Sequence, residues 1–179
     1  KISGLQPVNE ALLYNDVYLI VLYAVRTPPH IVISVSGKIF TLTVKGTTID
    51  AQLSSLLKLI KQRNIETVFV KLSVPPLFTI EQLMDEIRKY TLAYPRVDVG
   101  IATCLAPVKD FCTSVYDTET RKVNFIYELL PKLYEQKVIS SCYQMNLENH
   151  LSYNSFCIKK YSMFDIHEGI RKTQEITMV

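Results

Sequence analysis

Residues 17–25, which read VYLIVLYAV, decide the fold of this chain. Every side chain in this run is apolar or aromatic, and most are β-branched or aromatic, so a strand formed here has two hydrophobic faces. Such a strand is covered on both sides, and the run is therefore the predicted central strand of a sheet. Pro28 and Pro29 end it, because proline has no backbone N–H to donate to a neighbouring strand.

A β-hairpin is predicted after the prolines. Residues 31–36 and 39–44 have strand composition, and in the second of them Phe40 and Leu42 alternate with polar side chains. The two runs are separated by Gly37 followed by Lys38. Glycine at the first central position is typical of a type II′ turn.

The hydrophobic period changes from that of a strand to that of a helix at Ile49. From there apolar residues recur at the spacing of one helix face, at Ile49, Leu53, Leu56, Leu57 and Ile60. This spacing predicts a helix that begins near Ile49. Thr47 or Thr48 is available as its N-cap.

A strand–helix–strand unit is predicted next. Residues 66–72 have strand composition, and Thr79 with Gln82 predicts the capping box of a helix that Pro95 ends. Residues 97–105 alternate apolar with small or polar side chains, which is typical of another strand. The two strands of such a unit are parallel and joined by a right-handed crossover.

The pattern leaves alternatives open after Pro107. Residues 112–116 and 122–127 suit a hairpin. Residues 125–137 suit a helix that either kinks or begins at Pro131. Both interpretations are kept.

Composition indicates one α/β domain over residues 1–179, with a last strand predicted at residues 156–163. With 48% hydrophobic and 21% charged residues, the chain can bury a core and is not of the disordered class. Its longest apolar run is less than half of the roughly 20 residues that span a bilayer, so we expect no membrane partner. A chain with this much core does not need disulfides, so we expect the four cysteines to be reduced and the protein to be intracellular, cytoplasmic or nuclear.

The predicted fold class is α/β, with helices packed on a mixed sheet in which an antiparallel hairpin precedes a βαβ unit. The order β-β-β-α-β-α-β-α resembles that of the ribonuclease H-like superfold. Active enzymes of that superfold hold two divalent metals with carboxylates, and the resemblance offers Asp16, Asp50 and Glu128 for a divergent metal-dependent nuclease. The predicted central strand contains no acidic residue, which favours a non-catalytic protein.

A second candidate site consists of Cys142, His150 and Cys157, with Cys104 or Cys112 as the candidate fourth member. Thiolate and imidazole are natural ligands of tetrahedral zinc, but this spacing is looser than the tight paired-ligand turns of structural sites. The alternative is that the cysteines are small core residues and the histidine lies at the surface. In order and place, and with the basic and aromatic residues 159–161 after them, the three residues resemble the end of a Maelstrom domain. Those domains resemble ribonuclease H-fold modules, carry a Glu-Cys-His-Cys zinc set and act in small-RNA silencing, so the resemblance implies zinc and an RNA-related role.

The formal net charge of +3 is concentrated in the first half of the chain. The basic residues that outnumber their acidic neighbours there are Lys38, Lys45, Lys58, Lys61, Arg63 and Lys71. On one shared surface they would attract the phosphates of RNA. The alternative is a solvated helix face with soluble strand ends.

The function predicted from these patterns is that of a non-catalytic intracellular binding module in a protein or ribonucleoprotein assembly, with roles in RNA silencing or RNA metabolism. Its expected partner is another protein, and RNA is the second candidate. Two alternatives stay open, a divergent metal-dependent nuclease and a dimerisation or scaffold domain that binds no nucleic acid. The sequence contains no glycine-rich phosphate loop and no G-x-S-x-G or H-E-x-x-H motif, so no cofactor is expected apart from the zinc candidate.

Overall fold

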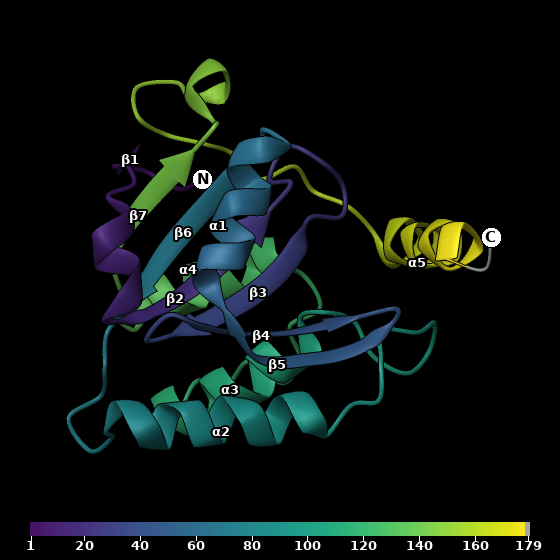
Figure 1. The fold of residues 1–179 in the computed structure, drawn as a ribbon, viewed down its shortest axis with the longest axis horizontal. Helices are drawn as coiled ribbons and strands as arrows, with labels where there is room; N and C mark the ends of the chain where they lie inside the picture. The colour runs from purple at the N-terminus through teal and green to yellow at the C-terminus, as the bar shows by residue number, and fades with distance from the viewer. Residues whose placement is uncertain (178–179) are drawn as a thin grey trace.

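The computed structural model describes residues 1–177 as an open, mixed sheet with helices on both faces, which confirms the predicted fold class (Figure 1). The strands follow the spatial order β1-β7-β6-β2-β3-β4-β5. Their bounds are Gln6–Pro7 (β1), Val17–Leu22 (β2), His30–Val35 (β3), Lys38–Thr43 (β4), Gly46–Gln52 (β5), Thr67–Leu72 (β6) and Ile139–Met145 (β7). β1 is parallel to β7, and every other neighbouring pair is antiparallel.

The helices form a layer on each face of this sheet. Their bounds are Leu53–Gln62 (α1), Ile80–Leu92 (α2), Ala106–Tyr116 (α3), Ile126–Glu135 (α4) and Met163–Thr177 (α5), with 3₁₀ helices at Glu10–Tyr14 (η1) and Glu148–His150 (η2). α1 and η1 cover one face, and α3 and α4 cover the other. α2 packs beside α3, and α5 lies at one side of the body (Figure 1).

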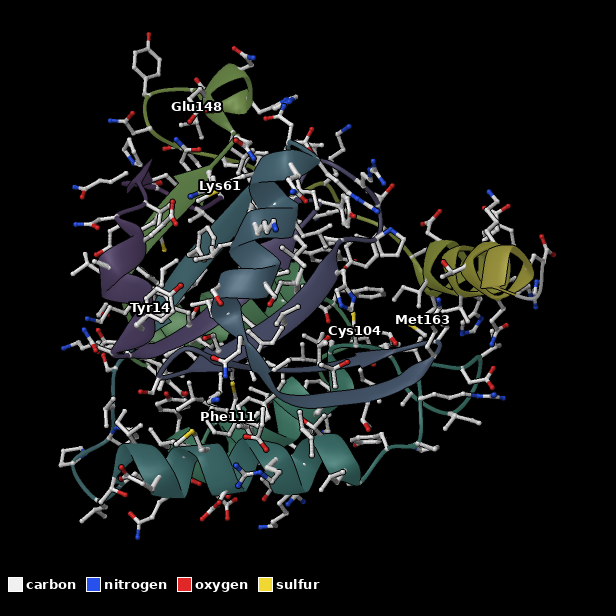
Figure 2. All side chains as sticks on the ribbon, in the orientation of Figure 1. Tyr14, Lys61, Cys104, Phe111, Glu148 and Met163 are labelled. Carbon is white, nitrogen blue, oxygen red and sulfur yellow. The ribbon has the colours of Figure 1, made fainter. Side chains whose placement is uncertain are left out.

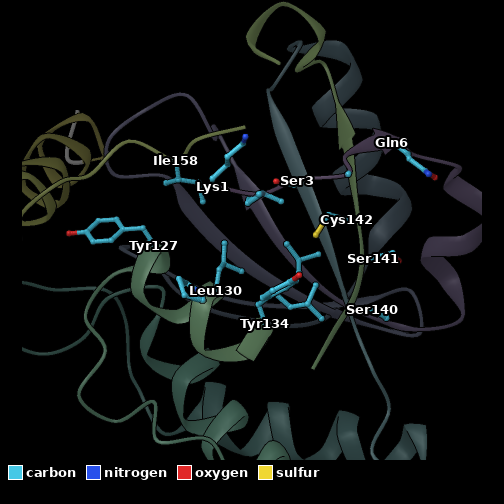
Figure 3. Close-up of a pocket in the computed structure, with 15 residues that line it drawn as sticks. Lys1, Ser3, Gln6, Tyr127, Leu130, Tyr134, Ser140, Ser141, Cys142 and Ile158 are labelled. Atoms are coloured by element: carbon cyan, nitrogen blue, oxygen red, sulfur yellow. The ribbon is translucent and has the colours of Figure 1, made fainter. Parts of the chain in front are cut away.

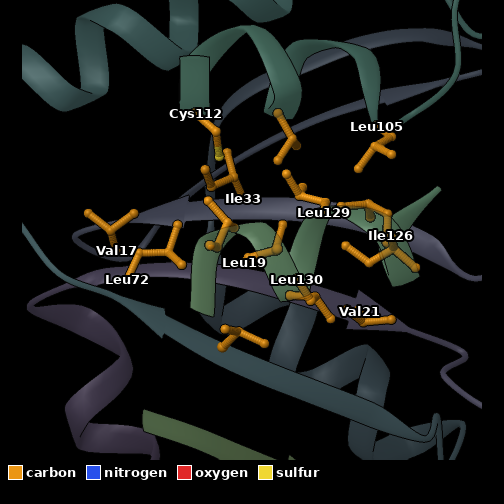
Figure 4. Close-up of a cluster of buried hydrophobic side chains, with 14 of the residues drawn as sticks. Val17, Leu19, Val21, Ile33, Leu72, Leu105, Cys112, Ile126, Leu129 and Leu130 are labelled. Carbon is orange, nitrogen blue, oxygen red and sulfur yellow. The ribbon is translucent and has the colours of Figure 1, made fainter. Parts of the chain in front are cut away.

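β2 is the central strand, as predicted, and all of its residues are buried. Leu19 and Val21 point into the core beneath α3 and α4, where they meet Leu129 (Figure 4). The alternate residues Tyr18 and Ile20 point into the core beneath α1. Both faces of this strand must therefore be apolar, which is the pattern that the sequence carries.

The predicted hairpin is confirmed, but its turn is of another type. Val35 pairs with Lys38, so Ser36 and Gly37 are the central residues, with φ values of 48° and 74°. Two positive φ angles define a type I′ turn rather than type II′. Position 37 also has no room for a larger residue, because a Cβ there would lie 2.8 Å from Cδ1 of the Tyr14 ring.

The helix predicted from Ile49 starts four residues later than expected. Gly46–Gln52 forms β5, and α1 begins at Leu53 with Gln52 as its N-cap, so neither candidate threonine caps it. Ile49 fits the helical spacing, but it packs against the core on the opposite face of the sheet. As a result Asp50 lies in a strand, with a φ of 56°.

The predicted βαβ unit is wrong. β6 is antiparallel to both of its neighbours, β2 and β7. Residues 97–105 are not a strand, because the chain turns at Gly100 (φ 76°) and closes an isolated bridge between Asp98 and Ala102. The capping box of α2 is confirmed, since Gln82 N–H donates to Thr79 Oγ1 (3.2 Å) and Thr79 N–H donates to Gln82 Oε1 (2.8 Å).

The structure also resolves the alternatives after Pro107. Residues 112–116 belong to α3, so the hairpin is wrong and the helix is right, as α4. The strand predicted at residues 156–163 is wrong as well, since this segment has only an isolated bridge from Phe156 to Ile2 before α5 begins.

Candidate functional site

A cavity of about 620 Å³ lies beside β7, and we call it the edge groove (Figure 3). On its outer side β7 pairs with β1 only at Tyr143 and Gln144. In the described part of the chain, residues 139–142 have no strand neighbour on that side. The groove therefore lies along an unpaired sheet edge, whose backbone N–H and C=O groups can pair with another strand.

The N-terminal segment opens this groove by leaving the sheet. Ile2 exchanges two backbone hydrogen bonds with Phe156, of 2.8 and 2.9 Å, and the N–H of Leu5 donates to the carbonyl of Asn154 at 2.9 Å. Gly4 between them has a φ of 69°, which favours glycine. Residues 1–4 thus pair with the segment at residues 154–156 instead of with β7, and they line the groove.

The opposite wall of the edge groove is α4. Leu130, Pro131 and Tyr134 face the space, and the Tyr134 side chain is 72% exposed (Figure 3). Among the described residues, Lys1 is the one charged residue in the lining. The groove is therefore a mostly apolar slot with few charges, and strand backbone lies along one side of it.

Cys142 lies within this slot opposite Val70 of β6, and both side chains line the groove. Burial raises the pKa of the Cys142 thiol to about 11. At neutral pH the thiol is protonated, so it is a weak nucleophile. Its role in the groove is that of a small apolar contact.

Each of the three carboxylates offered for a nuclease is occupied in a structural interaction. Asp16 forms an ion pair with Lys71 at 2.7 Å, and Asp50 forms one with Arg88 at 2.8 Å. Glu128 accepts the N–H groups that precede α4, from Asn124 (3.0 Å) and Phe125 (3.3 Å). No group of three or more His, Cys, Asp or Glu side chains that could hold a metal occurs in residues 1–177.

The zinc candidates are likewise not assembled into a ligand cluster within these residues. Cys142 lies in the edge groove, His150 is exposed in η2, and Cys157 is exposed in the segment before α5. The three residues in this arrangement do not fit a tetrahedral metal site.

The six basic residues do not form one patch. Lys58, Lys61 and Arg63 lie on or at the end of α1, and Lys71 points to the same face of the sheet. Lys61, seen on α1 in Figure 2, pairs with Glu10 at 2.6 Å, and Lys71 pairs with Asp16. The other two basic residues lie on β4 (Lys38) and in the turn after it (Lys45).

Comparison with protein-family models, with curated protein sequences and with solved structures finds no match to this chain. Within residues 1–177, no helix combines the length and the hydropathy that a membrane crossing needs.

Sequence reasoning missed the edge groove, because its walls come from segments that are distant in the sequence, chiefly the N-terminus, α4 and β7. One signal was present. Tyr134 stands outside the apolar stripe of α4, which consists of Ile126, Leu129, Leu130 and Leu133. A large aromatic residue on the outer side of a helix is a candidate contact residue.

Proposed function

We propose that this chain is a non-catalytic protein-binding module that holds an extended segment of a partner against β7. The observation that carries the proposal is that the apolar edge groove adjoins the unpaired backbone of residues 139–142. An added strand gains main-chain hydrogen bonds from such an edge and side-chain contacts from the groove.

The geometry of β7 supports this mode of binding. The N–H of Val8, the residue after β1, donates to the carbonyl of Gln144 at 3.0 Å. The backbone carbonyl of Gln144 therefore points to the outer side of β7, where β1 lies. By the alternation of a strand, the N–H and C=O of Cys142 point to that same side. A partner segment would extend the pairing that β1 begins.

Side chains of the partner segment would alternate between the two faces of the sheet. Those on the α4 side would enter the groove between Cys142 and Tyr134, two of the residues that line it. We therefore expect apolar residues at every second position of the partner segment.

The lining favours a protein over RNA as the occupant. A phosphate backbone is bound by several cations, and Lys1 is the one cation among the described lining residues. The occupied carboxylates Asp16, Asp50 and Glu128 support a non-catalytic role over the nuclease alternative.

The test is a selection from a phage-displayed library of random linear dodecapeptides, with the Tyr134→Glu protein as the counter-selection target. Selected peptides should carry alternating apolar residues, and Tyr134→Glu should weaken them about tenfold or more. Tyr153→Glu is the matched control, because Tyr153 is 99% exposed and does not line the groove.

Two results would overturn the proposal. One is that no enriched peptide distinguishes the Tyr134→Glu protein from the control. The other is that single-stranded RNA, and not peptide, binds the protein in a manner that Tyr134→Glu abolishes.

A further inference from the structure

A second cavity, of about 540 Å³, lies beneath α5, and we call it the α5 pocket. The connection between β2 and β3 forms one wall, and the end of β4 with the start of α3 forms another. Cys104, labelled in Figure 2, is among the residues that line it. The size is within the range of sites for small organic ligands.

α5 forms the roof of this pocket through a close and specific packing. Ile166 and Ile170 are buried against Leu42, in a small cluster separate from the two main cores. Gly169 faces Pro28, and a Cβ at this position would be in ordinary contact with the proline ring, 3.4 Å from Cδ. α5 is therefore held in place at the pocket rather than projecting freely.

The polar groups inside the pocket are neutral. Thr41 donates its hydroxyl proton to the carbonyl of Ile31 (3.1 Å), so its oxygen accepts from Nε2 of His30 (3.0 Å). This leaves Nδ1 of a neutral imidazole unprotonated. Burial lowers the pKa of His30 to about 4 and raises that of Cys104 to about 11, so both are uncharged at neutral pH.

The charges at the pocket are all positive. Arg26 and Lys172 are exposed lining residues, and no Asp or Glu is among the described residues of the lining. Lys172 is paired with Glu168 at 3.3 Å. Arg26 lies 4.4 Å from the centroid of the Tyr23 ring, a contact that positions the guanidinium without neutralising it.

We propose that the α5 pocket binds an amphipathic carboxylate, with its apolar chain between Leu42, Leu105 and Ile170 and its carboxylate at Arg26. An apolar interior demands an apolar ligand body, because a buried charge without a partner is costly. The guanidinium at the rim supplies a bidentate partner for one carboxylate.

The test compares two amphiphiles of equal chain length and opposite charge, decanoate and decyltrimethylammonium, by calorimetry below their micelle-forming concentrations. Decanoate should bind with saturation at one equivalent, about tenfold or more tighter than the cation. Arg26→Glu should reverse this preference. Lys132→Glu makes the same charge change on the outer face of α4, away from the pocket lining, and should leave the preference intact.

Amide hydrogen exchange locates the binding. Decanoate should slow exchange in α5, because Ile166 and Ile170 would contact it. Equal affinity for the two headgroups, an equal effect of both charge reversals, or slowed exchange confined to other elements would each overturn the proposal. Tyr134→Glu should not change decanoate affinity, so failure at the edge groove and failure here are separate results.

Discussion

The carboxylate of Asp50 on β5 accepts two hydrogen bonds from the guanidinium of Arg88 on α2, at 3.0 Å from Nε and 2.8 Å from Nη2. This bidentate contact joins the edge strand of the sheet to a helix of the outer layer. It also lowers the pKa of the Asp50 carboxyl from its ordinary value. Asp50 thus has a structural contact in place of the metal-binding role that the ribonuclease H-like resemblance offered it.

Asp50→Asn should destabilise the protein in a manner that depends on pH. The pKa of Asp50 is lower in the folded protein than in the unfolded chain, where it is about 4. The contribution of Asp50 to the free energy of unfolding is therefore present above pH 4, and it is lost as the pH falls through the lower folded-state pKa. Urea unfolding at pH 7 and at pH 3 measures this. We expect wild type to have a larger free energy of unfolding than Asp50→Asn at pH 7, and this difference should shrink towards pH 3. Asp85 is an exposed carboxylate on α2 that also pairs with Arg88. A difference that does not change with pH, or one no larger than that of Asp85→Asn, would contradict the assignment.

His30 should make stability depend on pH in a different window. Its pKa is lowered to about 4 by burial, so the unfolded chain binds more protons between about pH 6.5 and pH 4. Stability is full above that window and falls as pH drops through it. After allowance for partial exposure, the loss should be roughly 2–3 kcal/mol. His30→Gln should remove this part of the pH dependence, and urea unfolding at pH 7, 5.5 and 4.5 would show whether it does.

The four cysteines should react with iodoacetamide in the order of their burial. Cys157 is exposed and should react first, the half-buried Cys142 and Cys104 more slowly, and the buried Cys112 last. Burial raises the pKa of Cys142 and Cys104 to about 11 and that of Cys112 to about 12, which lowers the thiolate fraction of each. Mass spectrometry of a time course gives the order. Joint protection of Cys142 and Cys157 that a chelator removes would instead support the zinc prediction.

Binding of single-stranded RNA should be weak and depend little on salt. Of the four basic residues on the α1 face, Lys61 and Lys71 are paired with acids, which leaves Lys58 and Arg63 for phosphates. Two such contacts predict a log–log salt slope of about −1.4. A fluorescence anisotropy titration at several salt concentrations measures the slope. A slope steeper than about −3 would contradict this prediction and support RNA as the partner.

The elements that the sequence predicted correctly are those whose signals are local. β2 is apolar on both faces because both faces are buried, and the Thr79 capping box lies within four residues. The predicted order of elements is wrong where a helical and a strand periodicity both fit the same residues. Ile49 fits a helical stripe and a strand equally well, and only its packing against the far core decides between them.

The candidate site could not be predicted, because long-range pairing creates it. β7 contains Ser140, Ser141 and Gln144, a composition that does not predict a strand, and it becomes one by pairing with β6. The edge groove then depends on the pairing of Ile2 with Phe156, which lies 154 positions further along the chain. Hydrophobic patterns within a short stretch of sequence do not predict such long-range contacts.

Amide hydrogen exchange of β7, with and without a peptide selected for the edge groove, tests the central claim most directly. If the peptide adds a strand, the amide of Cys142, which points to the open side, should exchange more slowly in the complex, while amides of α1 on the far face should not change. Unchanged exchange across residues 139–142 in a saturated complex would contradict strand addition at this edge.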